Sequence, residues 1–103
     1  MNLSSLFGLS AQSAGSESTL AHQWVARGAF LLDVRTREEF TQRHVKGAMN
    51  IPVQELAARL AELPEVSRDI VVYCQSGGRS ARAAALLMDR GHRVLDLGPI
   101  SAW

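Results

Sequence analysis

Short apolar runs alternate along this chain with segments whose apolar residues recur at helical spacing. Residues 29–34 and 70–73 are nearly unbroken apolar runs, which is typical of strands covered on both faces. Residues 47–51 and 93–97 are predicted to form two further, less continuous strands. Each strand is separated from the next by a segment with helical features.

The first helix is predicted in front of the first strand. Ser18 or Thr19 can cap its amino end, and Gly28 can end it. Leu20 and Trp24 then fall on one face of this helix, four residues apart. The pattern therefore predicts a short amphipathic helix that packs against the sheet.

The next two helices are predicted from a capping box and from a proline. The Thr36 side chain can accept a hydrogen bond from the Glu39 amide while Glu39 reaches back, so a short helix with Phe40 facing inward should follow. Pro52 opens another predicted helix. The apolar face of that helix is predicted to comprise Val53, Leu56, Leu60 and Leu63.

The last helix is predicted between residues 74 and 91. Its small and apolar residues at positions i, i+3, i+4 and i+7 are Ala81, Ala84, Ala85 and Met88. Gly91 is a predicted carboxyl-terminal cap. Gly98 and Pro99 are predicted to turn the chain after the final strand.

This order of strands and helices predicts an α/β fold. We expect a three-layer sandwich in which helices cover both faces of a central parallel sheet of about four to five strands. Residues 18–103 form the predicted domain, and residues 1–17 are a predicted flexible lead-in whose second half is rich in Ser, Ala, Gly and Gln. Ligands of such sheets bind beyond the carboxyl ends of the strands.

Length, charge and cysteine content limit the possible functions. The 103 residues are enough for one compact domain. A formal net charge of +1 gives no global field that would favour nucleic acid or membrane binding. No stretch approaches the ~20 apolar residues of a membrane span, and the first residues lack the basic start of a signal peptide. Since the single cysteine is most easily kept reduced in a reducing compartment, we expect a cytoplasmic protein.

Cys74, the only cysteine, lies where an apolar run meets a predicted helix. The six residues that follow it are Gln75, Ser76, Gly77, Gly78, Arg79 and Ser80. Two adjacent glycines allow the chain to curl so that successive N–H groups point inward and form a nest for negative charge. A helix amino end favours anions and lowers the pKa of a thiol. The segment therefore predicts a reactive thiolate that handles an anionic substrate.

Other chemistries find less support in the sequence. A papain-like hydrolase needs a histidine beside its cysteine, but His22, His44 and His92 all lie outside the loop. One cysteine and three scattered histidines show no spacing of metal ligands, so neither a metal nor a cofactor is expected. The simplest alternative for Cys74 is a buried residue that only fills the core.

Three segments of the chain resemble the single-domain rhodaneses, which are thiosulfate sulfurtransferases. Residues 74–80 resemble the family's Cys-x-x-Gly-x-Arg-Ser loop, residues 31–40 its first long strand and following helix, and residues 44–52 its His-to-Pro stretch. The resemblance runs from about Thr19 to Trp103 and therefore covers nearly the whole predicted domain. Gly98-Pro99 departs from a Gly-Gly pair that members often carry before a later tryptophan.

The resemblance implies a rhodanese-like fold and a two-stage transfer of sulfur. Cys74 would be the catalytic residue and would carry a persulfide taken from thiosulfate or another small anionic donor. A thiol or cyanide would accept the sulfur, and a thioredoxin-like or sulfur-carrier protein is a candidate acceptor. The amides from Gln75 to Ser80 would stabilise the persulfide, and Arg79 would help to draw in the donor.

Two rival functions share some of these features. Cysteine phosphatases and arsenate reductases use a Cys-x5-Arg loop, whereas Cys74 and Arg79 have only four residues between them, which suits a single sulfur better than phosphate. A rhodanese-like domain can also serve as a non-catalytic or persulfide-carrying binding module. As structural support for the site, we expect Asp33 to form a buried ion pair with Arg35 or Arg79.

Overall fold

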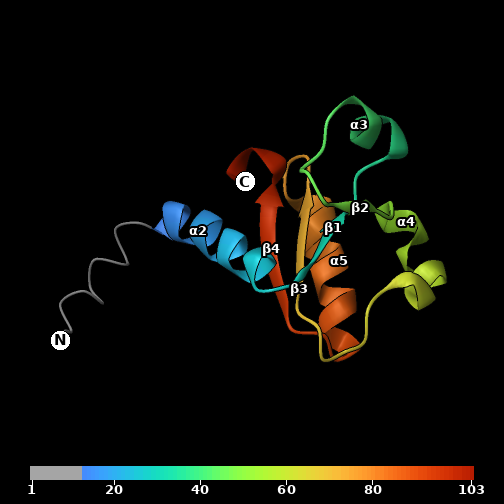
Figure 1. Cartoon of the computed structure of the whole chain (residues 1–103). Coiled ribbons are helices and arrows are strands. Elements are labelled where there is room, and N and C mark those ends of the chain that lie inside the picture. Colours follow the sequence, from blue (N-terminus) through green and yellow to red (C-terminus); the bar gives the residue numbers. More distant parts are fainter. Residues whose placement is uncertain (1–12) are drawn as a thin grey trace.

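The computed structural model describes residues 13–103, and it describes side chains from residue 17 onward. Figure 1 labels its α-helices and strands. In chain order the elements are α2 (Ser13–Ala26), β1 (Phe30–Asp33), α3 (Arg37–Gln42), β2 (Met49–Asn50), α4 (Val53–Leu56), the 3₁₀ helix η1 (Ala57–Glu62), β3 (Ile70–Cys74), α5 (Gly78–Asp89), β4 (Val94–Pro99) and the 3₁₀ helix η2 (Ile100–Ala102). None of these helices is long and apolar enough to cross a membrane.

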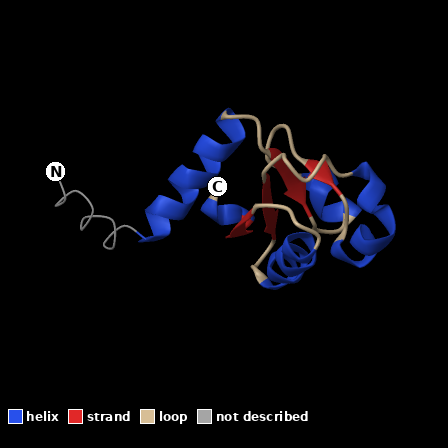
Figure 2. Ribbon diagram, turned by 90° about the horizontal axis from the view of Figure 1, so that it is seen from below, coloured by secondary structure: helices blue, strands red, loops and turns tan. Residues whose placement is uncertain are grey.

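The strands form one parallel sheet in the order β2-β1-β3-β4. Figure 2 shows helices on both sides of this sheet. The predicted α/β architecture is therefore confirmed, with four strands. β3 lies in the middle, between β1 and β4, so its last residue is held by neighbours on both sides.

Alternating side chains of β3 enter two separate cores. Val72 and Cys74 face the core that contains Leu56 of α4 and Leu87 of α5. Val71 and Tyr73 face the core on the other side of the sheet, which α2 and η2 cover. All five residues of β3 are buried, which confirms the buried strand predicted over residues 70–73 and adds Cys74 to it.

The first helix begins earlier than predicted. α2 starts at Ser13, so neither Ser18 nor Thr19 is its cap. The Ser18 hydroxyl instead donates to the Trp103 carbonyl at 3.2 Å, a long-range contact that no local pattern can reveal. The face towards the sheet is also rotated, because Ala21 is fully buried while Leu20 remains 40% exposed.

The helix predicted over residues 53–63 is not continuous. It breaks into α4 and η1, and Arg59 within η1 has non-helical φ and ψ. Leu63 adopts an extended conformation, as expected for a residue that precedes a proline. Pro64 therefore prevents regular helix from continuing, and the last turns tighten to 3₁₀ geometry.

The buried face of α5 differs from the predicted one by one residue. Its buried residues are Ser80, Ala83, Ala84 and Leu87, whereas three of the four predicted positions, Ala81, Ala85 and Met88, are exposed. Both sets have the same helical spacing. Alanine buries little surface wherever it lies, so the position of a leucine decides which face packs.

β4 continues through the predicted turn. Its pairing with β3 shifts by one residue at a bulge, so that Tyr73 pairs with Gly98 and Cys74 with Pro99. Gly98 has a φ of +84° and donates its N–H to the Asp96 carboxylate at 2.9 Å. A bulge of this kind uses glycine to absorb the extra residue, which is why Gly98 bends the strand without ending it.

Candidate active site

Cys74 is the last residue of β3 and lies at the carboxyl edge of the sheet, where the carboxyl ends of the strands meet. The sequence placed it at the start of a loop, but the sheet extends far enough to include it. Its side chain is fully buried and packs in the core with α5. The sulfur is therefore closed off from solvent, and Gly77 of the following loop contacts it.

The main chain of this loop turns back towards the sulfur. The Gly77 N–H donates to Cys74 Sγ, with 2.9 Å between nitrogen and sulfur. Gly77 has a φ of +109°, in the left-handed region that glycine adopts without steric cost. α5 begins at the next residue, so the amino end of a twelve-residue helix lies beside the thiol.

These donors lower the pKa of Cys74. Burial alone raises this pKa, but hydrogen bonds from the Ser80 side chain and from the amides of Ser80, Gly77 and Ser76 outweigh burial. The Ser80 hydroxyl also lies 3.1 Å from the Gly77 carbonyl and donates to it. Because a hydroxyl has one proton, Ser80 donates to sulfur only when it leaves that carbonyl, and the amides are the permanent donors.

Arg79 forms an ion pair with Glu39 of α3. Its Nη1 and Nη2 atoms lie 2.8 and 3.1 Å from the two carboxylate oxygens. The hydrogen bonds from the Arg79 guanidinium lower the pKa of Glu39, burial raises it, and the bonds from Thr36 lower it further, so that the pKa falls from 4.5 to about 2. Glu39 also completes the predicted capping box with Thr36. The sequence identified Glu39 only as a capping residue, and nothing local indicates that it joins α3 to the loop.

Asp33 and Arg35 form the expected buried ion pair. Arg35 Nη2 lies 2.7 Å from the Asp33 carboxylate, and both side chains are almost fully inaccessible. Burial lowers the pKa of Arg35, but the hydrogen bonds and the charge of Asp33 raise it by more, so this pKa lies above its ordinary value. Arg35 also donates to Gln75 Oε1 at 3.2 Å and to the Arg43 carbonyl at 2.6 Å. It therefore ties the loop after Cys74 to β1.

Tyr73 is a second supporting residue that the sequence did not single out. Its buried hydroxyl accepts the Val45 N–H at 3.1 Å, and its ring lies 5.6 Å from the Arg35 guanidinium carbon. Burial raises the pKa of Tyr73 above its ordinary value, so the hydroxyl stays protonated. The only local indication of this role in the sequence is that Tyr73 directly precedes Cys74 at the end of a buried strand.

No histidine hydrogen-bonds with Cys74 in residues 13–103. His44 Nδ1 donates to the Phe40 carbonyl at 2.8 Å and the His44 ring stacks on the Phe40 ring, while His22 packs edge-on against Trp103. His92 is nearly buried in the connection between α5 and β4. The same residues contain no cluster of three or more metal-ligating side chains. The site thus surrounds the Cys74 sulfur with main-chain donors that favour its ionised form, and no histidine of the described residues hydrogen-bonds to it.

Comparisons with known proteins agree on the family. The rhodanese-like domain family model matches residues 17–103. A sulfurtransferase of Allochromatium vinosum is 44% identical over 75 residues, which cover 71% of this chain and 69% of that protein. Thiosulfate sulfurtransferase 16 of Arabidopsis thaliana is 40% identical over 98 residues, with 82% of each chain covered.

The fold is similar to that of solved rhodanese-like structures. The crystal structure of the Alr3790 protein from Anabaena shares 32% sequence identity with this chain. The two superpose with a TM-score of 0.73 over 84% of this chain and 81% of that one. The resemblance inferred from the three sequence segments is thereby confirmed.

Proposed function

This chain belongs to the rhodanese-like domain family, and from that premise we propose that it is a sulfurtransferase whose Cys74 carries the transferred sulfur. The donor is thiosulfate or a similar small anion that contains a sulfane sulfur. The acceptor is a thiolate, either a small thiol or a thioredoxin-like or sulfur-carrier protein, and cyanide replaces it in an assay.

The proposed reaction has two displacement steps. The Cys74 thiolate attacks the outer sulfur of thiosulfate, the S–S bond of the donor breaks, and sulfite leaves with the bonding electrons. Cys74 then holds a persulfide. The acceptor thiolate attacks the outer sulfur of that persulfide, which returns Cys74 to the thiolate and completes a ping-pong cycle.

The observation that carries the proposal is the Gly77 N–H directed at Cys74 Sγ. A main-chain donor at 2.9 Å, the adjoining amides and the amino end of α5 favour a negative charge on sulfur. This arrangement supports a thiolate and, one atom further out, a persulfide anion. It removes the need for a histidine base.

Full burial of Cys74 adds a condition to this mechanism. A donor sulfur reaches Sγ only when the residues above it move, because the thiol has no exposed surface. Gln75 and Ser76 directly follow Cys74 and are exposed, so we propose that their movement gives the donor access to the sulfur. The loop is fastened at Gln75 by Arg35 and at Arg79 by Glu39.

The Arg79–Glu39 ion pair also bears on the phosphatase alternative. A cysteine phosphatase needs its loop arginine to bind the oxygens of the phosphoryl group, but both Arg79 Nη atoms already bind Glu39. The four-residue spacing between Cys74 and Arg79 also encloses less space than a Cys-x5-Arg loop. Both observations favour sulfur over phosphate chemistry. For Arg79 to attract the donor, as the family resemblance implies, its bonds to Glu39 must first loosen.

The test is turnover of thiosulfate with cyanide, measured for the wild type and for Cys74→Ser. We expect activity only in the wild type, since serine cannot hold a persulfide. Intact mass after thiosulfate treatment should rise by about one sulfur atom in the wild type and stay unchanged in the variant. A wild-type protein that neither turns over thiosulfate nor gains mass would overturn the proposal, provided that it is folded.

A second candidate function rests on the same burial of Cys74. A rhodanese-like binding module that only carries a persulfide, or that has no catalytic role, does not need a donor to reach the sulfur quickly. A gain in mass without turnover favours the carrier. An unchanged mass, with Cys74 slow to react with iodoacetamide in the folded protein, favours the non-catalytic module.

A further inference from the structure

A second charged site lies at the opposite end of the sheet from Cys74. The amino edge, where β1, β3 and β4 begin, borders a pocket of about 350 Å³. The strand β3 separates the two sites, because Asp69 precedes its first residue and Cys74 is its last. Five residue steps of extended chain place their Cα atoms roughly 16 Å apart.

Three arginines and a single carboxylate line this pocket. Arg27 follows α2, Arg68 and Asp69 precede β3, and Arg93 precedes β4. The whole chain has a formal net charge of only +1, so the pocket concentrates positive charge well above the average of the molecule. A concave surface lined mainly by one sign of charge attracts ligands of the opposite sign.

Two of the arginines are held in place before any ligand arrives. Arg68 Nε donates to the Gly28 carbonyl at 2.8 Å, and Arg93 binds both carboxylate oxygens of Asp69 at 2.7 and 3.1 Å. The Arg93 guanidinium also lies over the Trp24 ring, 4.4 Å from its centroid. A fixed guanidinium loses less entropy on binding an anion than a freely rotating one.

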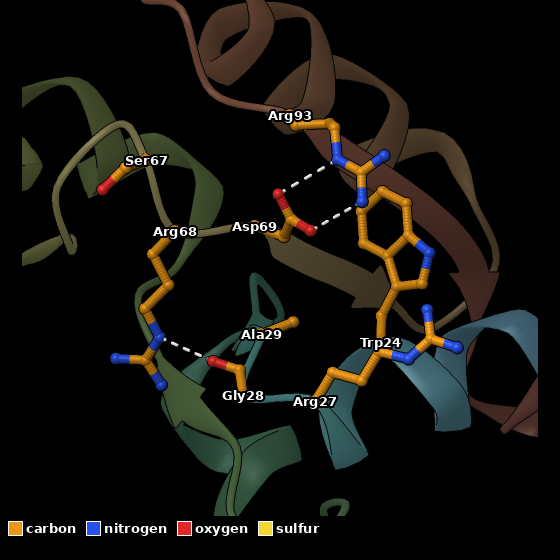
Figure 3. A pocket seen from close by; sticks show the side chains of 8 residues that line it. All are labelled: Trp24, Arg27, Gly28, Ala29, Ser67, Arg68, Asp69 and Arg93. Carbon is orange, nitrogen blue, oxygen red and sulfur yellow. Dashed lines mark hydrogen bonds and ion pairs between the residues drawn. The ribbon is translucent and has the colours of Figure 1, made fainter.

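The fixed arginines keep donors that are not used within the protein. In the described part of the chain, neither terminal nitrogen of Arg68 has a hydrogen-bond partner, and the Arg27 guanidinium and the Ser67 hydroxyl have none either. Figure 3 shows Arg68 on one side of Ala29, with Trp24 and Arg93 on the other. The two terminal nitrogens of Arg68 suit a dianion with several acceptor oxygens, whereas the Arg27 guanidinium lies beyond Trp24 and adds positive charge from further away.

The size and walls of the pocket indicate more than a bare ion. Its volume falls at the small end of the range for pockets that hold organic ligands, roughly 300–1,000 Å³. Trp24 and Ala29 provide apolar surface between the charged groups. We propose that this pocket binds a small organic phosphomonoester, with the phosphate on the unused terminal nitrogens of Arg68 and the organic part against Ala29 and Trp24. This second site is independent of sulfur transfer at Cys74.

Substitutions of Asp69 and Arg68 should change the affinity for the phosphomonoester in opposite directions. The Asp69 carboxylate repels an anion, although Arg93 partly neutralises it, so Asp69→Asn should tighten binding. Arg68→Ala removes two unused donors and a positive charge and should weaken binding about tenfold or more. Arg27→Ala, which removes no side-chain hydrogen bond of the described residues, should weaken binding less, because it removes only a more distant positive charge, and it guards against misfolding of the Arg68 variant.

Phenyl phosphate is a suitable probe, titrated into ¹⁵N-labelled protein by NMR. Saturable shifts are expected at the amides of Ala29, Asp69 and Arg93, with a dissociation constant of about 1 mM or tighter. Arg82→Ala is the matched control, because Arg82 is an exposed arginine on α5 outside the pocket, and it should leave the affinity unchanged.

Three outcomes would overturn the proposal. The first is shifts confined to residues 75–80, which would mean that the probe binds only the cysteine loop. The second is equal affinity for inorganic phosphate and phenyl phosphate, which would assign the pocket to inorganic anions instead. The third is equal weakening by Arg82→Ala and Arg68→Ala, which would reduce the effect to overall charge.

Discussion

The two edges of the sheet attract negative charge by different means. At the carboxyl edge, main-chain N–H groups around Cys74 provide the positive potential, and Glu39 neutralises the nearby Arg79. At the amino edge, the arginine side chains themselves provide it, and they are mostly exposed to solvent. The first site is small, buried and fixed by the backbone, whereas the second is wider and depends on side chains.

This difference determines which substitutions should matter. At the carboxyl edge the Asp33–Arg35 pair is fully buried, so that loss of one partner leaves a charge without water or a partner, and the Arg79–Glu39 pair is half-buried. The ion pair at the amino edge is exposed and is already screened by solvent. Stability should therefore respond strongly to changes at one edge and weakly to changes at the other.

The largest effect is expected for Asp33→Ala. This change leaves the Arg35 guanidinium buried without its carboxylate and should lower the free energy of unfolding by about 3–5 kcal/mol in urea denaturation. The matched change at the amino edge, Asp69→Ala, leaves behind only the exposed guanidinium of Arg93, which water can solvate, and should leave stability nearly unchanged. Equal losses in the two variants would break the contrast between the edges.

Gly77→Ala should have the next largest effect. A Cβ at this position meets no atom within 4 Å, so the expected loss of about 1–2 kcal/mol comes from the left-handed backbone alone. The pKa of the Cys74 thiol should rise if the amide rotates away from sulfur. Gly78→Ala is the control, since Gly78 is the first residue of α5, lacks a positive φ and has equal space. A destabilised Gly78 variant would show that space, and not φ, is limiting.

Glu39→Gln should cost less, about 1 kcal/mol, because the pair with Arg79 is partly open to solvent. The folded pKa of Glu39, about 2, lies below its ordinary value of 4.5. The ion pair therefore stabilises the fold above pH 4.5, and this contribution is lost as the pH falls towards 2. The wild type and the variant should converge in stability over that interval. If the variant also alkylates faster at Cys74, the ion pair restrains the loop.

The smallest effect on stability is expected from the ionisation of Cys74. Its pKa is lowered in the folded protein, so alkylation by iodoacetamide should show a midpoint below the ordinary thiol value of about 8.5. The favoured thiolate stabilises the folded state fully above pH ~8.5, and the gain disappears as the pH falls through the lowered pKa. Cys74→Ser should lack this pH dependence. A midpoint above 8.5 would mean that burial outweighs the amide donors.

The cysteine loop could be predicted from the sequence because its parts are contiguous. Cys74, Gly77 and Ser80 lie within seven residues, and their chemistry depends on main-chain geometry that two glycines permit. The buried pair of Asp33 with Arg35 was also predictable, since both residues end the same strand region. The fold followed from the alternation of apolar runs and helical spacing.

Features that join distant segments could not be predicted in this way. Glu39 reaches Arg79 across 40 residues, and the pocket at the amino edge combines residues that follow α2 with residues that precede β3 and β4. Each of these arginines is unremarkable in its own segment. The continuation of β4 through Gly98 and Pro99 was missed for a related reason, because pairing with β3 outweighs the local turn tendency of a Gly-Pro pair.

The covered position of Cys74 has a consequence for chemical durability. Peroxide converts an accessible thiolate to sulfenic acid and then, irreversibly, to sulfinic and sulfonic acids. This chain has no second cysteine that could trap the sulfenic acid as an internal disulfide. Exclusion of the oxidant by the loop is thus the only protection that the chain itself gives its sulfur, and any change that speeds donor access also shortens the working life of the protein.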